Sequence, residues 1–150
     1  MASVDVRTEI VIDRPLELVA AFAGDPSNVT RWYQNIKSVE WKSPPPVRLG
    51  SQIAFVARFL GRRLAYTYEV VEHTPGVRLV MRTADGPFPM ETTYEWTAEG
   101  SGATRMSLRN RGEPSGFSRL VAPLMSMAVR RANQKDLRML KIVLESGAIA

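Results

Sequence analysis

The residues of this chain that could do chemistry are few, and their types exclude several kinds of site. The sequence has no cysteine and one histidine, His73, so disulfides, thiolate metal sites, cysteine nucleophiles and paired-histidine metal sites are excluded. His73 stands in Glu-His-Thr-Pro-Gly, a pattern typical of a solvated turn. No serine has the Gly-x-Ser-x-Gly setting, and no glycine-rich phosphate loop precedes a helix. We therefore assign no catalytic residue and expect no metal and no cofactor.

Hydroxyl groups are the polar chemistry that recurs among the apolar positions of the strand-like segments. Tyr66, Tyr68, Thr92 and Tyr94 share the parity of their apolar neighbours. Such hydroxyls can orient a carbonyl or a phenol, but they are weak acids and bases near neutral pH. The same face is expected to receive Thr8, Trp96, Thr104 and Asn110, and from a C-terminal helix Asn133, Gln134 or Asp136.

Asp136 is the acidic residue of that helix that could face inward. Burial beside an apolar cavity raises the pKa of a carboxyl group toward the range useful for proton transfer. Its position on the helix is ambiguous, because Ala132 and Leu140 lie four residues away on either side while Arg131 and Lys135 flank it.

The spacing of apolar residues indicates which elements carry these groups. Alternation over residues 4–12 predicts a strand. Pro15 and Gly24 bound a short helix, and Asp25-Pro26 begins a second one that ends near Trp32-Tyr33. Six further strands and a long helix that begins properly near Pro123 follow; the predicted ranges are 37–42, 52–60, 63–72, 77–83, 88–97 and 103–110 for the strands and 117–146 for the helix.

This order of elements predicts the α+β class. The short turns require antiparallel neighbours, so the six later strands form a meander. With the first strand, they make a curved seven-stranded antiparallel sheet whose apolar face is covered by the long C-terminal helix, with two short helices between strands one and two.

The opposite face of the predicted sheet carries charges of alternating sign. With the turns taken as register marks, Arg82 and Arg109 both lie next to Glu91, Glu69 lies opposite Arg82, and Asp5 extends the row. Each such pair contributes about 0.2–1 kcal/mol. Arginines that already have carboxylate neighbours make a poor track for phosphates, which disfavours nucleic-acid binding on this face.

Several loosely spaced positions along the chain carry a family resemblance: Ile10-x-Ile12-x-x-Pro15-x-x-Leu18, Trp32, Gly50, Tyr68-x-Val70 with Pro75, Gly102-x-Thr104, and Leu137-x-x-Leu140-Lys141. In this order the sequence resembles the START-like or SRPBCC superfamily, which has the helix-grip fold, and within it the polyketide cyclase/dehydrase and lipid transport members. The resemblance covers nearly the whole chain, and its motifs are markers of the fold.

The resemblance implies a cavity between the sheet and the long helix that takes a lipid, a polyketide, a sterol or a quinone. Its expected volume is on the order of 300–1,000 Å³. A solid core is the simpler alternative, but the methionines and buried tyrosines favour an adaptable cavity. The residues expected to bind the ligand are Phe55, Tyr66, Tyr68, Met81, Met90, Thr92, Tyr94, Met106, Met125, Val129 and Ala132.

Three functions follow as hypotheses. The first is a non-enzymatic binder or carrier of a hydrophobic small molecule, and the alternative is a polyketide cyclase or dehydratase that uses the same cavity. The third is an interaction protein that associates with ribosomes or an anionic membrane. Ribosome association is what the resemblance to some relatives implies, and the net charge of +6 on residues 101–150, against −1 on residues 1–100, suits such a partner. A solvated helix face is the simpler interpretation of that charge, and nucleic acid or a ribosome is the less favoured partner.

The length of 150 residues fits one ligand-binding domain over residues 1–150. The N-terminal segment has charges within its apolar stretch, unlike a signal peptide. No stretch approaches 18 consecutive apolar residues, so no transmembrane segment is expected. These features predict a cytoplasmic protein, which could be a monomer or a homodimer.

Overall fold

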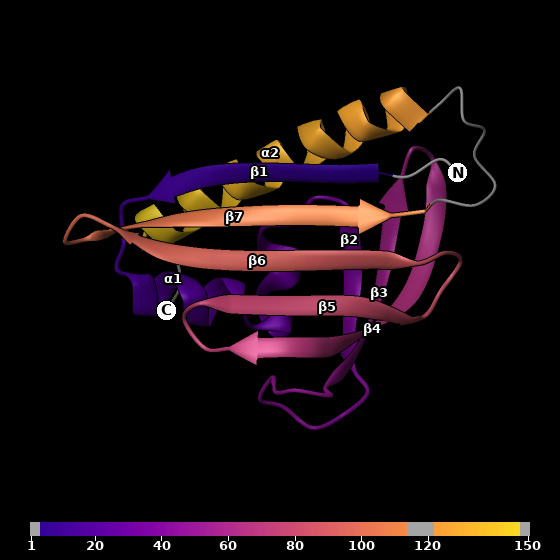
Figure 1. The fold of residues 1–150 in the computed structure, drawn as a ribbon, viewed down its shortest axis with the longest axis horizontal. Helices are drawn as coiled ribbons and strands as arrows, with labels where there is room; N and C mark the ends of the chain where they lie inside the picture. The colour runs from indigo at the N-terminus through magenta and orange to yellow at the C-terminus, as the bar shows by residue number, and fades with distance from the viewer. Residues whose placement is uncertain (1–3, 114–121, 148–150) are drawn as a thin grey trace.

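The structure is a computed structural model that describes residues 4–113 and 122–147. It contains seven strands, two α-helices and one 3₁₀ helix, shown in chain order by colour in Figure 1. The elements are β1 (Val4–Ile12), α1 (Leu16–Ala23), η1 (Pro26–Arg31), β2 (Ile36–Trp41), β3 (Gln52–Phe59), β4 (Arg62–Thr74), β5 (Arg78–Asp85), β6 (Met90–Glu99), β7 (Ala103–Gly112) and α2 (Ala122–Glu145).

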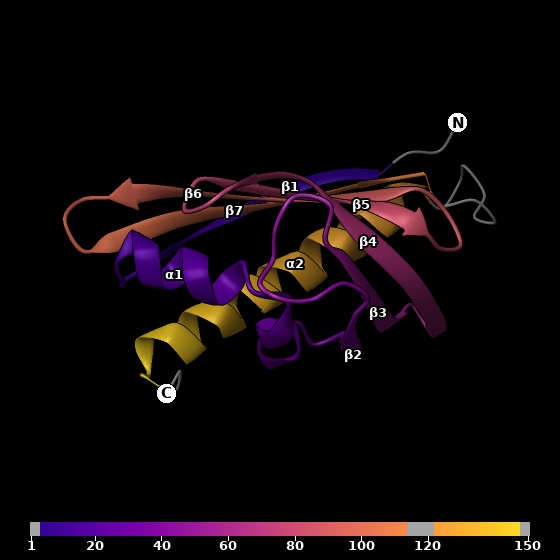
Figure 2. The same ribbon diagram turned by 90° about the horizontal axis from the view of Figure 1, so that it is seen from below.

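All seven strands form one antiparallel sheet in the order β1-β7-β6-β5-β4-β3-β2. The six later strands are a meander, as predicted. The first strand, β1, forms one edge of the sheet and pairs with β7 from Val4↔Gly112 to Ile12↔Thr104. Figure 2 shows α1 and α2 on the same side of the curved sheet. The predicted α+β architecture is confirmed.

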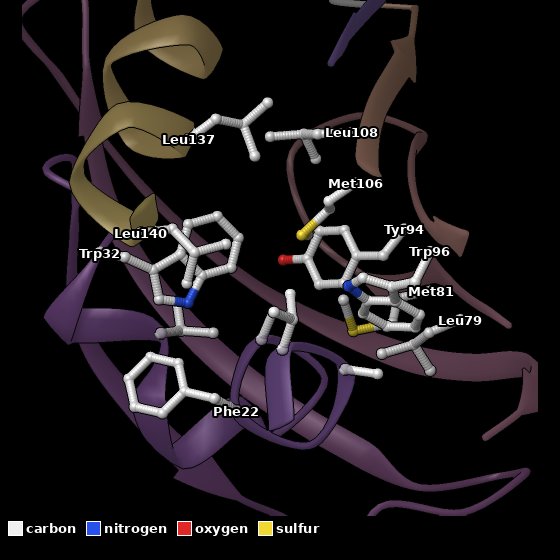
Figure 3. Packing of buried hydrophobic residues seen from close by; sticks show 14 of the residues in the cluster. Phe22, Trp32, Leu79, Met81, Tyr94, Trp96, Met106, Leu108, Leu137 and Leu140 are labelled. Atoms are coloured by element: carbon white, nitrogen blue, oxygen red, sulfur yellow. The ribbon is translucent and has the colours of Figure 1, made fainter. Parts of the chain in front are cut away.

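The long helix packs on the sheet through a row of leucines. Leu137, Leu140 and Leu144 are at most 1% exposed and belong to the same cluster as Met106 and Leu108 of β7. Figure 3 shows Leu137 next to Leu108. Burying side chains of this size contributes about 1.5–3 kcal/mol each, so these leucines hold α2 across the sheet.

The two short helices begin and end where proline, aspartate and glycine indicate. Pro15 precedes α1, and Gly24 caps its C-terminal end with an N–H donated to the Ala20 carbonyl. The Asp25 carboxylate caps η1 by accepting a hydrogen bond from the Ser27 N–H at 2.9 Å. The long helix is described from Ala122; residues 117–121 of its predicted range lie outside the described residues.

The charge row on the outer face is present with one wrong pairing. Glu91 makes ion pairs with Arg82 at 2.9 Å and with Arg111 at 2.6 Å. Arg109, predicted to lie beside Glu91, pairs instead with Asp5 at 2.6 Å. Although partial burial by itself raises the pKa of Glu91, the hydrogen bonds from Arg82 and Arg111 bring it below its ordinary value.

The error comes from the turn between β6 and β7. Glu99 pairs with Ala103 across a three-residue loop, so the hairpin is centred on Ser101 and not on Gly100. Moving the centre by one residue moves every cross-strand partner by two. A shift of two keeps each side chain on its face, so the assignment of faces holds while Arg111 replaces Arg109. Glu69 lies opposite Arg82, as predicted.

Candidate ligand-binding cavity

A cavity of about 180 Å³ lies between the sheet and α2. Its walls come from η1 and the segment after it, from β3 to β7, and from one face of α2. Ten of the eleven residues predicted to bind a ligand line it: Phe55, Tyr66, Tyr68, Met81, Met90, Thr92, Tyr94, Met125, Val129 and Ala132. Their role in binding stays a prediction.

Met106 is the residue of that set that the cavity does not include. Its side chain is fully buried on β7, opposite Trp96, where it packs in the main hydrophobic cluster. Parity alone placed it on the inner face, which is correct, but parity does not distinguish the part of that face under the cavity from the part under the leucines of α2. Met127 of α2 is 61% exposed and does not line the cavity.

The cavity is smaller than the 300–1,000 Å³ typical of small-molecule sites. Aromatic rings account for this. Phe55, Tyr66 and Tyr68 contact one another with ring centroids 5.0–5.8 Å apart. Tyr33 and Tyr94 occupy another part of the wall. The space that remains has the size of a site for one or two rings, since a cavity of about 150 Å³ accommodates benzene.

A chain of hydrogen bonds runs through the wall from the sheet to α2. The Tyr68 hydroxyl lies 2.9 Å from the Thr92 hydroxyl, and Thr92 Oγ1 donates to Asn110 Oδ1 at 2.6 Å. Asn110 Nδ2 then donates to Asn133 Oδ1 at 3.0 Å. Burial raises the pKa of Tyr68 to about 12, so the hydroxyl is neutral near pH 7. Of the three helix residues considered, Asn133 and Asp136 face the cavity and Gln134 is exposed.

Tyr33 is a cavity residue that the sequence did not indicate. It follows η1, outside any strand or regular helix, and its hydroxyl lies 2.8 Å from that of Tyr94 on β6. Burial raises the pKa of both tyrosines above their ordinary values. The signal that could have found it is its position next to Trp32, whose ring is 4.3 Å away and deeply buried.

Asp136 is buried at the polar end of the cavity. It is 2% exposed, and its Oδ1 accepts a hydrogen bond from the Gln34 N–H at 3.1 Å. Burial raises the pKa of this carboxyl to about 6, although the Gln34 hydrogen bond acts in the opposite direction. Asp136 therefore changes its protonation near neutral pH, which a group that transfers protons must do.

The cavity is also lined by residues from the far ends of the strands, which were not among the residues predicted to bind a ligand. Phe59, Arg62 and Leu64 belong to the β3–β4 hairpin, and Phe88 belongs to the β5–β6 turn. Phe59, Leu64 and Phe88 are half-buried. Phe59 and Leu64 lie at the ends of β3 and β4 and keep the parity of the inner face, whereas Phe88 lies in a turn, where strand periodicity assigns no face.

A second hollow, of about 690 Å³, lies between α1, the loop that contains Pro45 and Pro46, and the β4–β5 turn. It includes His73, which is half-buried near the end of β4. None of the cavity tyrosines lines it. Within residues 4–113 and 122–147, no group of three or more His, Asp or Glu side chains could hold a metal ion.

The outer surface of α2 carries part of the basic excess. Arg131, Lys135 and Arg138 are exposed, whereas Lys141 pairs with Glu145 and Arg130 donates to the Arg7 carbonyl. Arg119, which belongs to the same basic set, lies outside the described residues. A ribosome or membrane partner for this face stays a prediction. No helix in the described parts of the chain is long and apolar enough to cross a bilayer.

The fold has many counterparts among solved structures. A protein from Thermus thermophilus, TTHA0849, superposes with a TM-score of 0.82 at 21% identity, over 95% of this chain and 98% of that one. The Zhui aromatase/cyclase from Streptomyces sp. R1128 gives a TM-score of 0.82 at 14% identity, over 99% and 97% of the two chains. A START superfamily protein from Mycobacterium smegmatis gives 0.81 at 13% identity, over 95% and 97%.

At these identities the likeness shows the shared helix-grip fold alone. No curated protein matches the sequence. A family model described as polyketide cyclase/dehydrase and lipid transport matches residues 3–145.

Proposed function

Because the chain belongs to the polyketide cyclase/dehydrase and lipid transport family of the START-like superfamily, we propose that it binds or carries a hydrophobic or amphipathic small molecule. The ligand occupies the cavity between α2 and the sheet. The observation that carries this proposal is that most of the cavity wall is apolar, while its hydrogen-bonding groups come from a few tyrosine, threonine, asparagine and aspartate side chains. An apolar site with a few placed polar groups is the usual composition of a small-molecule site.

The volume narrows the class of ligand. A space of about 180 Å³ suits a compact molecule of one or two rings, such as a small quinone or an aromatic polyketide fragment. A sterol or a lipid with two acyl chains requires a larger space than this cavity provides. We therefore favour a compact ring compound over the larger candidates.

Native mass spectrometry of the gently purified protein tests this proposal. We expect a population whose mass exceeds that of the chain by one small molecule, which is released under denaturing conditions. The released compound, identified by its mass and fragmentation, gives the ligand class directly. A spectrum with the unliganded mass alone, together with no binding of added one- or two-ring aromatic compounds, would contradict the proposal.

A second function, polyketide cyclase or dehydratase, is favoured by Asp136. This carboxyl is buried at the cavity and has a pKa of about 6. Its carboxylate could take a proton from the carbon between two ketone groups, and that carbon would then attack another carbonyl carbon of the same molecule and close a ring. The protonated Asp136 would return the proton to the alkoxide oxygen formed. It would next take the second proton from the same carbon and give it to the departing hydroxyl, so that water is lost. The aromatase/cyclase from Streptomyces sp. R1128 has the same fold, which is compatible with this use of the cavity.

The two functions are separated by what Asp136→Asn does. If the protein is a cyclase, a synthetic poly-β-ketone thioester incubated with the native protein should lose the mass of water, and the variant should bind this compound but not convert it. If the protein is a carrier, the thioester should be recovered unchanged with both proteins. The asparagine keeps an oxygen for the Gln34 N–H, so the local structure is preserved.

A further inference from the structure

The hydrogen bonds from Tyr68 to Asn133 all point in the same direction. Asn110 Oδ1 can only accept, so Thr92 donates its one hydroxyl proton there. Thr92 must then accept from the Tyr68 hydroxyl at 2.9 Å. The Asn110 amino group continues the direction by donating to Asn133 Oδ1. The chain begins at a tyrosine on β4 and ends at an amino group on α2.

The last group in this chain has no partner. Asn133 is 4% exposed, and its Nδ2 finds no acceptor among residues 4–113 and 122–147. An unsatisfied buried donor is costly, which is why nearly all such groups in proteins have a partner. If the Asn133 amide alone were rotated by 180°, its amino group would face the Asn110 amino group, and two donors would meet without an acceptor. The hydrogen bond with Asn110 therefore favours the orientation that leaves Asn133 Nδ2 as a free donor.

Asn133 belongs to the wall of the cavity. It lines the cavity between Val129 and Asp136, which stand one turn before and one turn after it on the same face of α2. The facing wall is largely apolar and includes Phe55 and Met81. A ligand that fills this space would bury its ring against the apolar wall and bring a polar atom to the helix.

We propose that the Asn133 amide donates a hydrogen bond to an acceptor oxygen of the ligand, so that the cavity selects ring compounds bearing a carbonyl over hydrocarbons of the same shape. The inference rests on the proposed function and specifies the ligand class for the same cavity. Asn133 acts here as a specificity determinant. Sites that present a buried hydrogen-bonding group discriminate strongly against analogues that leave that group unpaired.

Two matched probes test the inference on the unmodified protein. Acetophenone and α-methylstyrene have nearly the same shape, but the second has a CH₂ group in place of the carbonyl oxygen. Titrations followed by tryptophan fluorescence or by NMR should show acetophenone binding about three- to tenfold more tightly, the effect of one hydrogen bond. Equal affinities would overturn the inference but leave the proposed function intact, whereas failure of both probes to bind would contradict both.

A pair of variants locates the discriminating group. Asn133→Leu has a similar size but no donor, and it should bind the two probes with equal affinity. Gln134→Leu makes the same kind of change at the exposed neighbouring position, and it should keep the preference for acetophenone. Asn133→Leu also leaves Asn110 Nδ2 without its acceptor, so the double variant Asn110→Leu/Asn133→Leu is measured beside it. A preference that persists in both variants would show that another donor recognises the carbonyl and would overturn the assignment.

A spectroscopic measurement keeps the inference testable if Asn133→Leu does not fold. The sequence has four asparagines, so selective ¹⁵N labelling of asparagine gives four side-chain amide signals. The Asn133 signal should shift strongly with acetophenone and weakly with α-methylstyrene. Equal shifts with both probes would contradict a hydrogen bond from this amide to the carbonyl.

Discussion

The hydroxyl groups of Tyr33 and Tyr94 lie 2.8 Å apart and join the segment after η1 to the middle of the sheet. One of the two hydroxyls donates to the other, so the proton of the second remains available inside the cavity wall. The contact connects residues 61 positions apart, and it fixes the 3₁₀ segment as part of the cavity. The geometry of this wall therefore depends on a bond between two neutral phenols.

The Tyr33–Tyr94 hydrogen bond is expected to contribute to stability as a pair. Tyr33→Phe and Tyr94→Phe should each lower the free energy of unfolding by about 0.5–1.5 kcal/mol, because each leaves a buried hydroxyl without its partner. The double variant should cost less than the sum of the two. Urea unfolding of the four proteins measures the coupling, and strictly additive losses would show that the bond contributes nothing.

Asp136 should make stability depend on pH in a defined window. Its folded-state pKa of about 6 is above the ordinary 3.8, so the folded state holds the proton more tightly than the unfolded state. The stabilisation from Asp136 is therefore fully present below about pH 4 and is lost as the pH rises from about 4 through about 6, by about 3 kcal/mol in total.

Asp136→Asn removes this dependence while keeping the acceptor for Gln34. Relative to the native protein, we expect the variant to be similar in stability near pH 4 and more stable by up to about 3 kcal/mol near pH 7.5. Urea unfolding at the two pH values measures the difference. An advantage of the variant that is the same at both pH values would contradict the raised pKa.

Glu91 should tolerate charge reversal poorly. Glu91→Lys places a third positive charge beside Arg82 and Arg111, whose guanidinium groups lie within 2.9 Å of its carboxylate. We expect a loss of about 1–2 kcal/mol, partly relieved by added salt. Glu40→Lys is the matched control, since Glu40 has a side chain 71% exposed and pairs with Lys42 at 3.2 Å. Equal losses in both variants would contradict the importance of the charge row.

A larger side chain in the cavity should weaken ligand binding without lowering the stability of the fold. Ala132→Leu adds three carbon atoms to a residue that lines the cavity on α2. We expect the affinity for acetophenone to fall by at least about tenfold, a change of about 1.4 kcal/mol, while the melting temperature stays level or rises. Ala21→Leu, an exposed position on α1, should leave the affinity unchanged. Undiminished binding by Ala132→Leu would place the bound probe elsewhere.

The sequence predicted the faces of the sheet better than the partners across it. Strand parity depends on local backbone geometry, and it placed Phe55, Tyr68, Met81 and Tyr94 correctly inside. Cross-strand partners depend on the number of residues in each loop, and the three-residue loop at Gly100 moved the partner of Glu91 from Arg109 to Arg111. Partners can shift by two residues while every face stays the same.

The candidate cavity was predictable where regular periodicity applies and not elsewhere. Tyr33 was missed because the residues after a short 3₁₀ helix follow no periodic pattern. The sequence did not show whether Asp136 faces inward, because one neighbour, Lys135, is exposed and the other, Leu137, is buried. Only the packing of α2 showed that Asp136 faces inward. Tertiary contacts of η1 and α2 decided both cases.

The pairing of β1 with β7 has a consequence for the order in which the molecule is built. Val4 pairs with Gly112 and Ile12 with Thr104. Because β7 is its only partner strand within the described parts of the chain, β1 can join the sheet only after β7 is available. The hairpins from β2 to β7 connect neighbours in sequence and can form early, whereas contacts between residues about 100 positions apart form slowly. During synthesis, β1 emerges first and remains unpaired until β7 is available, and α2 follows later still. The cavity between the sheet and α2 is therefore among the last features of the molecule to form.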